Sequence, residues 1–211
     1  MSDLTVKELE ERLAIALTSE KAKDSVFQML GLNFGSIIFA DSASTVPQSK
    51  QTGSSSKPFS SLQKAIEAAE KLNPKTRCLV LVAPNSAFDE DIIISGGRML
   101  SILGLGAWTI GNAAGSNFAS TTARSVTWNV TEANPTTFRE TLVMGALFSD
   151  EMSSTHTAYT SGLEISGNFN VNAVIGTQSL ELHLRSVKVV GNFDTTGTPT
   201  RGIQAFLRKC Y

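Results

Sequence analysis

Residues 179–193 read SLELHLRSVKVVGNF, and this stretch determines the predicted fold. From Leu180 to Leu184, leucines alternate with polar residues, which is the pattern of a strand with one buried face. The alternation slips by one residue at Ser186 and resumes at Val187. A hairpin needs a turn of two or more suitable residues, so the slip indicates a corner at which the chain bends and keeps its apolar residues inward.

Similar short segments recur along the chain at intervals near 20 residues. Leu163–Ile165 aligns with Leu182–Leu184, 19 residues on, and Leu184–Val187 aligns with Leu207–Cys210, 23 residues on. Intervals of this length fit one coil of a β-solenoid, in which stacked coils bury a continuous core. We therefore expect residues 35–211 to form a right-handed parallel β-helix. A β-sandwich or jelly roll remains the alternative, because it would also consist of many short strands.

Two helices are expected before this β-rich part. In residues 1–34, Thr5 and Glu8 have the spacing of a capping box, and apolar residues then recur at helical spacing. This amphipathic helix either packs on its own domain or binds copies of itself or a partner; both interpretations stay open. The positions expected to mediate oligomerisation or docking are Leu9, Leu13, Leu17, Phe27 and Leu30. A second helix is expected near residues 60–72, capped by Ser60 or Ser61 and ended by Asn73-Pro74.

Three motifs around the second helix resemble a known family. They are Pro58–Ile66 (PFSSLQKAI), Val82–Phe88 (VAPNSAF) and Ile102–Gly104 (ILG). The region from 36 to 106 is similar in these motifs to the N-terminal part of pectin-lyase-like right-handed β-helix proteins, although Asn85 stands where that family usually has Gly. The resemblance implies a solenoid capped by a helix. It leaves the function open, since the superfamily includes pectinases, lyases, epimerases, phage tailspikes and other virion appendages.

Composition and charge exclude several classes of function. The formal net charge is −1 and basic residues do not cluster, so we expect no nucleic-acid partner. No apolar run reaches about 18 residues, so no membrane span is expected. The N-terminus lacks the pattern of a secretory signal, which favours synthesis in the cytosol. Cys78 and Cys210 lie far apart in sequence and are interpreted as free thiols.

Few residues suggest chemistry, and no cofactor is expected. The alignment of repeats places Glu164 beneath His183 on an outer face, and this pair could transfer protons. Asp89 and Asp91 are weak candidates for a metal site. Hard cations need several oxygen ligands, but side chains alternate along a strand, so Glu90 points to the other face and only two carboxylates can converge. Phe118 and Trp108 are weak candidates for stacking on a sugar ring.

These observations favour a structural or attachment component of a larger assembly over an enzyme. By resemblance, a virion appendage such as a tailspike, fibre or capsid-associated protein is expected, with a homo-oligomer, favoured as a trimer, or other subunits as partners. The alternative is a polysaccharide lyase or hydrolase acting as a depolymerase, or a carbohydrate-binding module. An acid/base pair on a polysaccharide needs two carboxyl groups about 5–10 Å apart. The sequence shows no such cluster on aligned segments, so enzymatic activity is undecided and disfavoured.

Overall fold

The computed structural model describes residues 36–72, 77–95, 99–111, 123–130, 140–147, 162–173, 180–196, 203–208 and 210. These residues form a mainly β structure with parallel sheets. The amphipathic helix predicted for residues 1–34, with the five positions expected to mediate oligomerisation, lies outside the described residues.

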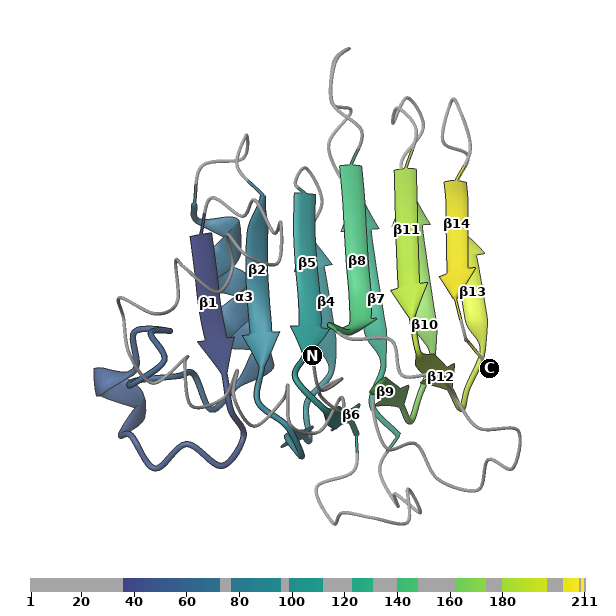
Figure 1. Ribbon diagram of the computed structural model, residues 1–211. Coiled ribbons are helices and arrows are strands. Elements are labelled where there is room, and N and C mark those ends of the chain that lie inside the picture. Colours follow the sequence, from purple (N-terminus) through teal and green to yellow (C-terminus); the bar gives the residue numbers. More distant parts are fainter. Residues whose placement is uncertain are drawn as a thin grey trace, which may run out of the picture.

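The largest sheet has six strands that lie side by side in chain order (Figure 1). They are β1 (Ser36–Ala40), β2 (Cys78–Val82), β5 (Met99–Gly104), β8 (Glu140–Ala146), β11 (Leu180–Arg185) and β14 (Ile203–Arg208). Each strand pairs with its neighbours in parallel. Parallel pairing requires the chain to travel away between successive strands and return to the same edge.

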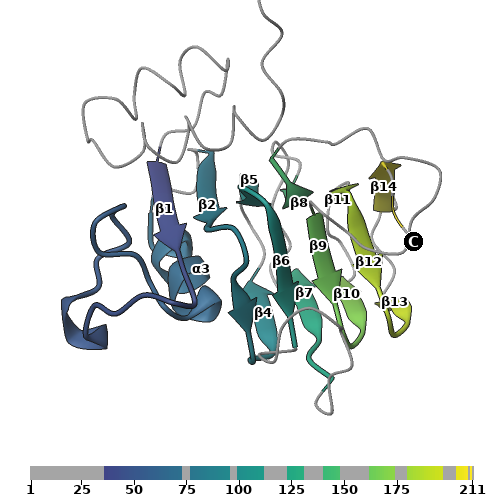
Figure 2. The same ribbon diagram turned by 60° about the horizontal axis from the view of Figure 1, so that its bottom comes forward.

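Two further sheets take up those excursions (Figure 2). One contains β4 (Ile92–Ser95), β7 (Val126–Val130), β10 (Phe169–Ala173) and β13 (Phe193–Thr196). The other contains β3 (Ala87–Phe88), β6 (Ala107–Ile110), β9 (Gly162–Ile165) and β12 (Val187–Val189). From β2 onward the chain visits the six-stranded sheet, then the β3 sheet, then the β4 sheet, and repeats this order.

The strand register confirms part of the predicted repeat and corrects the rest. Leu184 pairs with Leu207, at the predicted interval. The predicted alignment of Leu163–Ile165 with Leu182–Leu184 is wrong, because β9 and β11 belong to different sheets. Leu163 pairs instead with Val187, the residue that follows the phase slip. Sequence similarity between apolar triplets could not distinguish one sheet from another, since every inward face has the same alternation.

The corner predicted at Ser186 is confirmed. β11 ends at Arg185, β12 begins at Val187, and the two strands lie in different sheets. Ser186 has a φ of 51°, a left-handed conformation that is uncommon for a residue with a side chain. The single residue therefore turns the chain from one sheet to the next without a hairpin.

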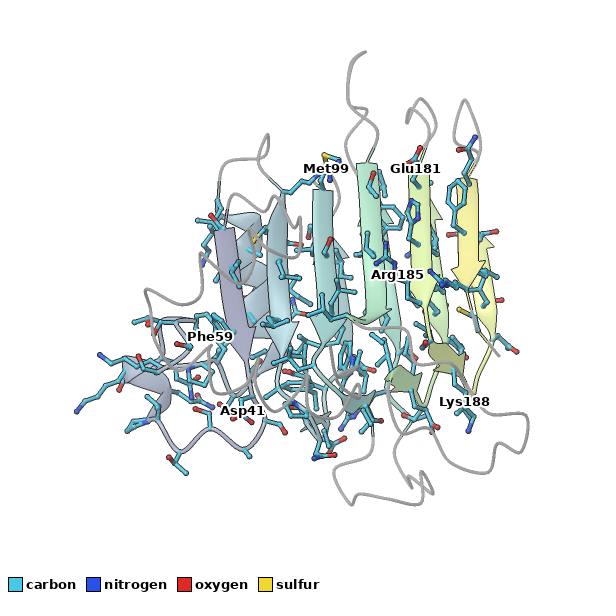
Figure 3. The ribbon with its side chains drawn as sticks, viewed as in Figure 1. Asp41, Phe59, Met99, Glu181, Arg185 and Lys188 are labelled. Carbon is cyan, nitrogen blue, oxygen red and sulfur yellow. The ribbon has the colours of Figure 1, made fainter. Side chains whose placement is uncertain are left out.

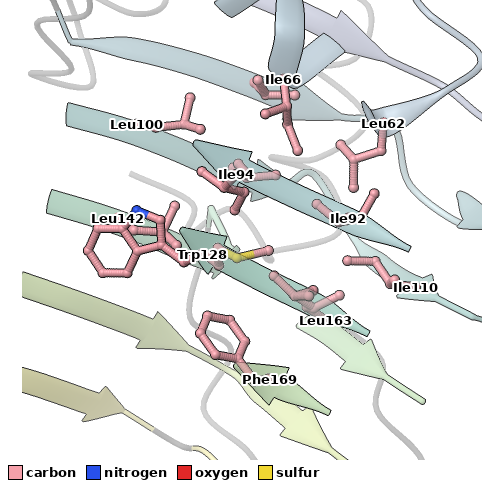
Figure 4. Packing of buried hydrophobic residues seen from close by; sticks show 14 of the residues in the cluster. Leu62, Ile66, Ile92, Ile94, Leu100, Ile110, Trp128, Leu142, Leu163 and Phe169 are labelled. Atoms are coloured by element: carbon pink, nitrogen blue, oxygen red, sulfur yellow. The ribbon is translucent and has the colours of Figure 1, made fainter. Parts of the chain in front are cut away.

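The main core is formed by inward-facing residues of all three sheets, and Figure 4 shows part of it from close by. Inward-facing residues of successive strands meet in register, as in the row formed by Ile92, Val126 and Phe169. Trp128 and Phe169 are among the largest fully buried side chains. Stacking apolar residues on apolar residues in this way buries each coil against the next.

One helix, α3 (Leu62–Glu70), covers the first end of this core and packs on β1, β2 and β4. Its apolar residues Leu62, Ala65, Ile66 and Ala69 are buried. Ser61 is the N-cap and accepts a hydrogen bond from the Lys64 amide, so the predicted helix near 60–72 is present with a slightly shorter span. A short 3-10 helix, η1 (Gln48–Lys50), lies in the polar loop that precedes it.

Candidate functional site

A groove of about 380 Å³ crosses the outer face of the six-stranded sheet from β5 to β11. We call it the outer groove. Its polar and charged lining residues are Arg77, Ser101, Thr141, Glu181, His183 and Arg185. Leu103, Val143 and Leu147 contribute apolar surface to its lining. The groove therefore combines cationic, anionic and apolar surface, as a site for a polar ligand with an apolar face would.

Strand β11 positions the charged side chains of the groove, and Figure 3 shows Glu181 and Arg185 on this strand. Glu181, His183 and Arg185 alternate with buried leucines, so all three project from the outer face. His183 Nε2 lies 3.7 Å from Glu181 Oε2, and the His183 ring stacks on Phe206 with centroids 4.5 Å apart. The alternation visible in the sequence could have identified this set, because every second residue of a half-buried strand shares a face.

The chemistry available to the outer groove is recognition of charge and hydroxyl groups. Arg77 and Arg185 are exposed at its lining and suit carboxylate or sulfate groups. Among the described side chains that line the groove, Glu181 is the one carboxylate. Hydrolysis of a glycoside uses two carboxyl groups, and the described lining supplies one of them.

The predicted pair of Glu164 and His183 is not brought together. Glu164 lies in β9, where its register partners are Thr109 and Lys188. His183 lies in β11 of the six-stranded sheet, between Val143 and Phe206. The two residues belong to different sheets, so they cannot act as the proton-transfer column expected from the alignment.

Glu164 is instead a buried carboxylate that forms an ion pair with the partly exposed Lys188. Lys188 Nζ lies 3.0 Å from Glu164 Oε2, while Glu164 Oε1 and Thr109 Oγ1 are buried without a hydrogen-bond partner in the described structure. Burial, the larger effect, raises the pKa of Glu164 above its usual 4.5, although Lys188 lowers it. Burying a carboxylate with one unsatisfied oxygen costs free energy of folding, and the ion pair with Lys188 offsets part of this cost.

The acidic cluster at residues 89–91 links parts of the fold. Asp89 Oδ1 accepts a hydrogen bond from Arg124 Nε at 2.8 Å, and Asp91 Oδ1 accepts one from the Ser125 amide at 2.8 Å. Asp89 and, less strongly, Asp91 raise the pKa of Arg124, and the hydrogen bond to Asp89 has the largest effect. The candidate metal ligands Asp89 and Asp91 thus face a cation of the protein itself. Within the described residues, no three His, Cys, Asp or Glu side chains are grouped to hold a metal ion.

Glu90, between the two aspartates, caps helix α3. It accepts hydrogen bonds from Ser61 Oγ and from the Leu62 and Gln63 amides. A carboxylate at this position satisfies free amide groups and interacts favourably with the helix dipole. Sequence reasoning missed this role, because Glu90 and the helix are about 28 residues apart and no local motif connects them.

The aromatic candidates for sugar binding do not line the outer groove. Trp108 is buried in the core, and its Nε1 donates a hydrogen bond to the Gly145 carbonyl at 3.1 Å. Trp108 is therefore a core residue and the prediction of an exposed sugar-stacking role for it is wrong. Phe118 lies outside the described residues. Phe206 is exposed and stacks on the groove residue His183, but it is not itself part of the groove lining.

A second candidate surface is the end of the sheets formed by the last strands. β12, β13 and β14 are each the terminal strand of their sheets. Four of the exposed large apolar residues lie on these strands or directly between them, and we call this surface the end face. They are Val190, Phe193, Phe206 and Leu207. Large exposed apolar patches usually mark sites of interaction.

Two remaining features of the described residues, their hydropathy and their cysteines, indicate no further site. No helix in the described part of the chain is long and apolar enough to span a membrane. Cys78 and Cys210 are free thiols, and burial raises the pKa of Cys210.

Comparison with protein-family models, curated proteins and solved structures finds no match. The outer groove and the end face are thus interpreted from their own geometry.

Proposed function

We propose that this chain is a structural or attachment component of a larger assembly, such as a tailspike, fibre or capsid-associated protein of a virion. The observation that carries the proposal is the end face, where residues in core register are exposed. A second copy of this chain is the proposed partner at this surface, with a trimer as the assembly that the family resemblance favours.

We also propose that the three parallel sheets form a right-handed parallel β-helix. The support is the fixed order in which the chain visits the sheets, together with the corner at Ser186. Right-handed crossovers are the rule between parallel strands. The strand pairs in the described residues are parallel, whereas a jelly roll pairs its strands antiparallel.

The strand register supports the proposal of a partner at the end face. Phe193 pairs with the buried Phe169 and stacks on its ring at 5.4 Å, while Leu207 pairs with the buried Leu184. Both positions face the core in every preceding coil. Phe193 is nevertheless 43% exposed and Leu207 is 62% exposed. Terminal coils of solenoids normally carry a polar cap, so apolar residues in these positions favour contact with another polypeptide.

Light scattering on the full chain tests this proposal. We expect an oligomer, and we expect the combined substitution Phe193→Ser and Leu207→Ser to shift it to the monomer mass. Ile93→Ser is the matched control, because Ile93 is an exposed apolar residue on β4, away from the end face. A monomeric wild-type chain at about 100 μM would overturn the proposal, as would an oligomer unaffected by the double substitution.

A second function is favoured by the outer groove, which could bind an acidic polysaccharide. The groove is lined by the cations Arg77 and Arg185 and by His183, whose ring stacks on that of Phe206 on the neighbouring strand β14. Calorimetric titration with polyuronate oligosaccharides tests this binding, and we expect Arg185→Ala to weaken it about tenfold. Incubation with the polysaccharide separates binding from cleavage: new unsaturated or reducing ends would show a depolymerase instead of an attachment module.

A further inference from the structure

A second apolar cluster lies on the outer face of the six-stranded sheet, and we call it the outer leucine cluster. It consists of Leu79, Leu81, Leu103 and Leu105. In β2 the intervening residue Val80 belongs to the main core. Because side chains alternate along a strand, Leu79 and Leu81 point away from that core.

Exposure changes steeply along one row of this face. Register places Leu79, Ser101, Val143, His183 and Phe206 side by side on five successive strands. Leu79 is 0% exposed and Ser101 is 9% exposed, but the His183 side chain is 29% exposed and Phe206 is 50% exposed. His183 has neighbouring strands on both sides, as Leu79 does, so its exposure represents an uncovered position on this face. The low exposure of Leu79 and Ser101 indicates that a further layer of polypeptide covers β2 and β5, and this layer does not extend to β14.

The described residues do not supply that cover. The partly buried apolar residues that pack against the outer leucine cluster are Ile37, Phe39, Val143 and Leu147. They belong to β1 and β8, or directly follow β8, and so lie in the sheet or at its border. Helix α3 packs on the main core instead. The described apolar neighbours therefore leave the outer side of the leucines to be covered by another part of this chain.

We propose that residues 1–35 of the same chain dock on the outer leucine cluster. This segment joins the sheet at Ser36, one residue before Ile37, so it begins at the edge of the cluster. Its leucines at 9, 13 and 17 have helical spacing and form one apolar face. The distance from β1 to β8 is about 14 Å at the usual strand spacing, and a helix of about 14 residues spans about 21 Å.

Residues 148–161 are the alternative within the chain, since they follow Leu147 at the other border of the cluster. After Phe148 they are mostly Ser, Thr and acidic residues, with Met152 and Tyr159 as the large apolar side chains. They lack an apolar stripe that could match four leucines. The N-terminal segment is therefore the better complement in both length and pattern.

Docking within the chain would change the role of the N-terminal helix. Leu9, Leu13 and Leu17 would be buried against their own sheet instead of mediating oligomerisation. The segment would also border the outer groove, because Leu103 belongs both to the cluster and to the groove lining. The proposal is independent of the assembly at the end face, which lies at the other end of the sheet.

Photo-crosslinking from Phe39 tests the proposal on the full chain. Phe39 is partly buried beside the cluster, so replacing it with p-benzoylphenylalanine keeps an aromatic ring in place. Irradiation of a mixture of ¹⁴N- and ¹⁵N-labelled protein should yield crosslinks to peptides from residues 1–35 that carry a single isotope. The same label at Ile93, on β4, is the control and should give no such crosslinks.

The combined substitution Leu13→Asp and Leu17→Asp should reduce the Phe39 crosslinks at least fivefold and raise the fluorescence of an apolar dye. Glu11→Gln, outside the apolar spacing, should leave both signals unchanged. Crosslinks from Phe39 to residues 148–161, or crosslinks with mixed isotopes, would overturn the proposal. So would undiminished crosslinks in the Leu13/Leu17 variant.

Discussion

The two ends of the stacked sheets are finished in opposite ways. At the first end, α3 covers the core, and Ile66 is fully buried against it. At the other end, Phe193 and Leu207 occupy core register and remain exposed. Among the described residues, one end is thus capped by helix α3, whereas the other exposes apolar side chains.

This difference indicates where an interaction can be added without rebuilding the fold. A capped end has satisfied its hydrogen bonds and buried its apolar residues, so it offers little to a partner. An end with exposed core positions gains from any polypeptide that continues the packing. The proposed assembly through the end face would therefore use the exposed core positions rather than a separate binding motif.

The largest expected effect is on the capped end. Ile66→Ala should lower the free energy of unfolding by about 3 kcal/mol, because it leaves a cavity between α3 and the core. Urea unfolding followed by circular dichroism measures this loss. A change below about 1 kcal/mol would show that α3 does not seal this end.

Lys188→Met should lower stability by about 2 kcal/mol at pH 7, less than for a fully buried pair because Lys188 is partly solvated. The substitution leaves the Glu164 carboxylate buried without its counter-charge. Since burial raises the pKa of Glu164, the folded state holds its proton more tightly than the unfolded state does. Glu164 therefore disfavours folding increasingly as pH rises above about 4.5.

Two measurements check the predicted direction in which the free energy of unfolding changes with pH. The loss caused by Lys188→Met should shrink at pH 4, where Glu164 is protonated in either variant. Glu164→Gln should remove this pH dependence and recover most of the stability in the Lys188→Met background. A loss that is the same at pH 4 and pH 7 would contradict the ion-pair interpretation.

The cap on α3 should contribute a smaller amount. Glu90→Ala removes the acceptor for Ser61 Oγ and for two amide groups at the start of the helix, so a loss of about 1 kcal/mol is expected. Glu67→Ala, at an exposed position of the same helix, should change stability by less than about 0.5 kcal/mol. Equal losses in the two variants would argue against a capping role for Glu90.

The smallest effect on stability is expected at the end face. Leu207→Ala should change the unfolding free energy of the monomer by about 0.5 kcal/mol or less, because the side chain is already exposed. The same substitution should weaken self-association by at least tenfold, as measured by sedimentation equilibrium. If Leu207→Ala caused a large loss of monomer stability and left self-association unchanged, Leu207 would be a folding residue, and the proposed role of the end face in association would be contradicted.

The sequence predicted local features well and long-range pairing less well. The strand alternation at residues 180–184, the corner at Ser186 and the helix near residues 60–72 follow from local periodicity and capping, and the structure contains them. The assignment of Glu164 to the column of His183 failed because apolar triplets in different sheets look alike. Which strands become neighbours depends on loop lengths and on all three sheets together.

The candidate sites were predictable to a similar extent. Glu181, His183 and Arg185 share a face by simple alternation, so the polar part of the outer groove could have been found. The contacts of Asp89 with Arg124 and of Glu90 with α3 join residues about 30 apart in sequence, and no local pattern encodes them. Exposure of Leu207 depends on what lies beyond β14, which periodicity cannot show.

Hydrogen exchange at different protein concentrations tests the central claim most directly. If the end face is buried by a second copy, amides in β13 and β14 should be protected at high concentration and lose at least tenfold of that protection on dilution to the monomer. Amides in β2, behind the capped end, should exchange at the same rate throughout. Protection of β13 and β14 that does not depend on concentration would contradict assembly through the end face.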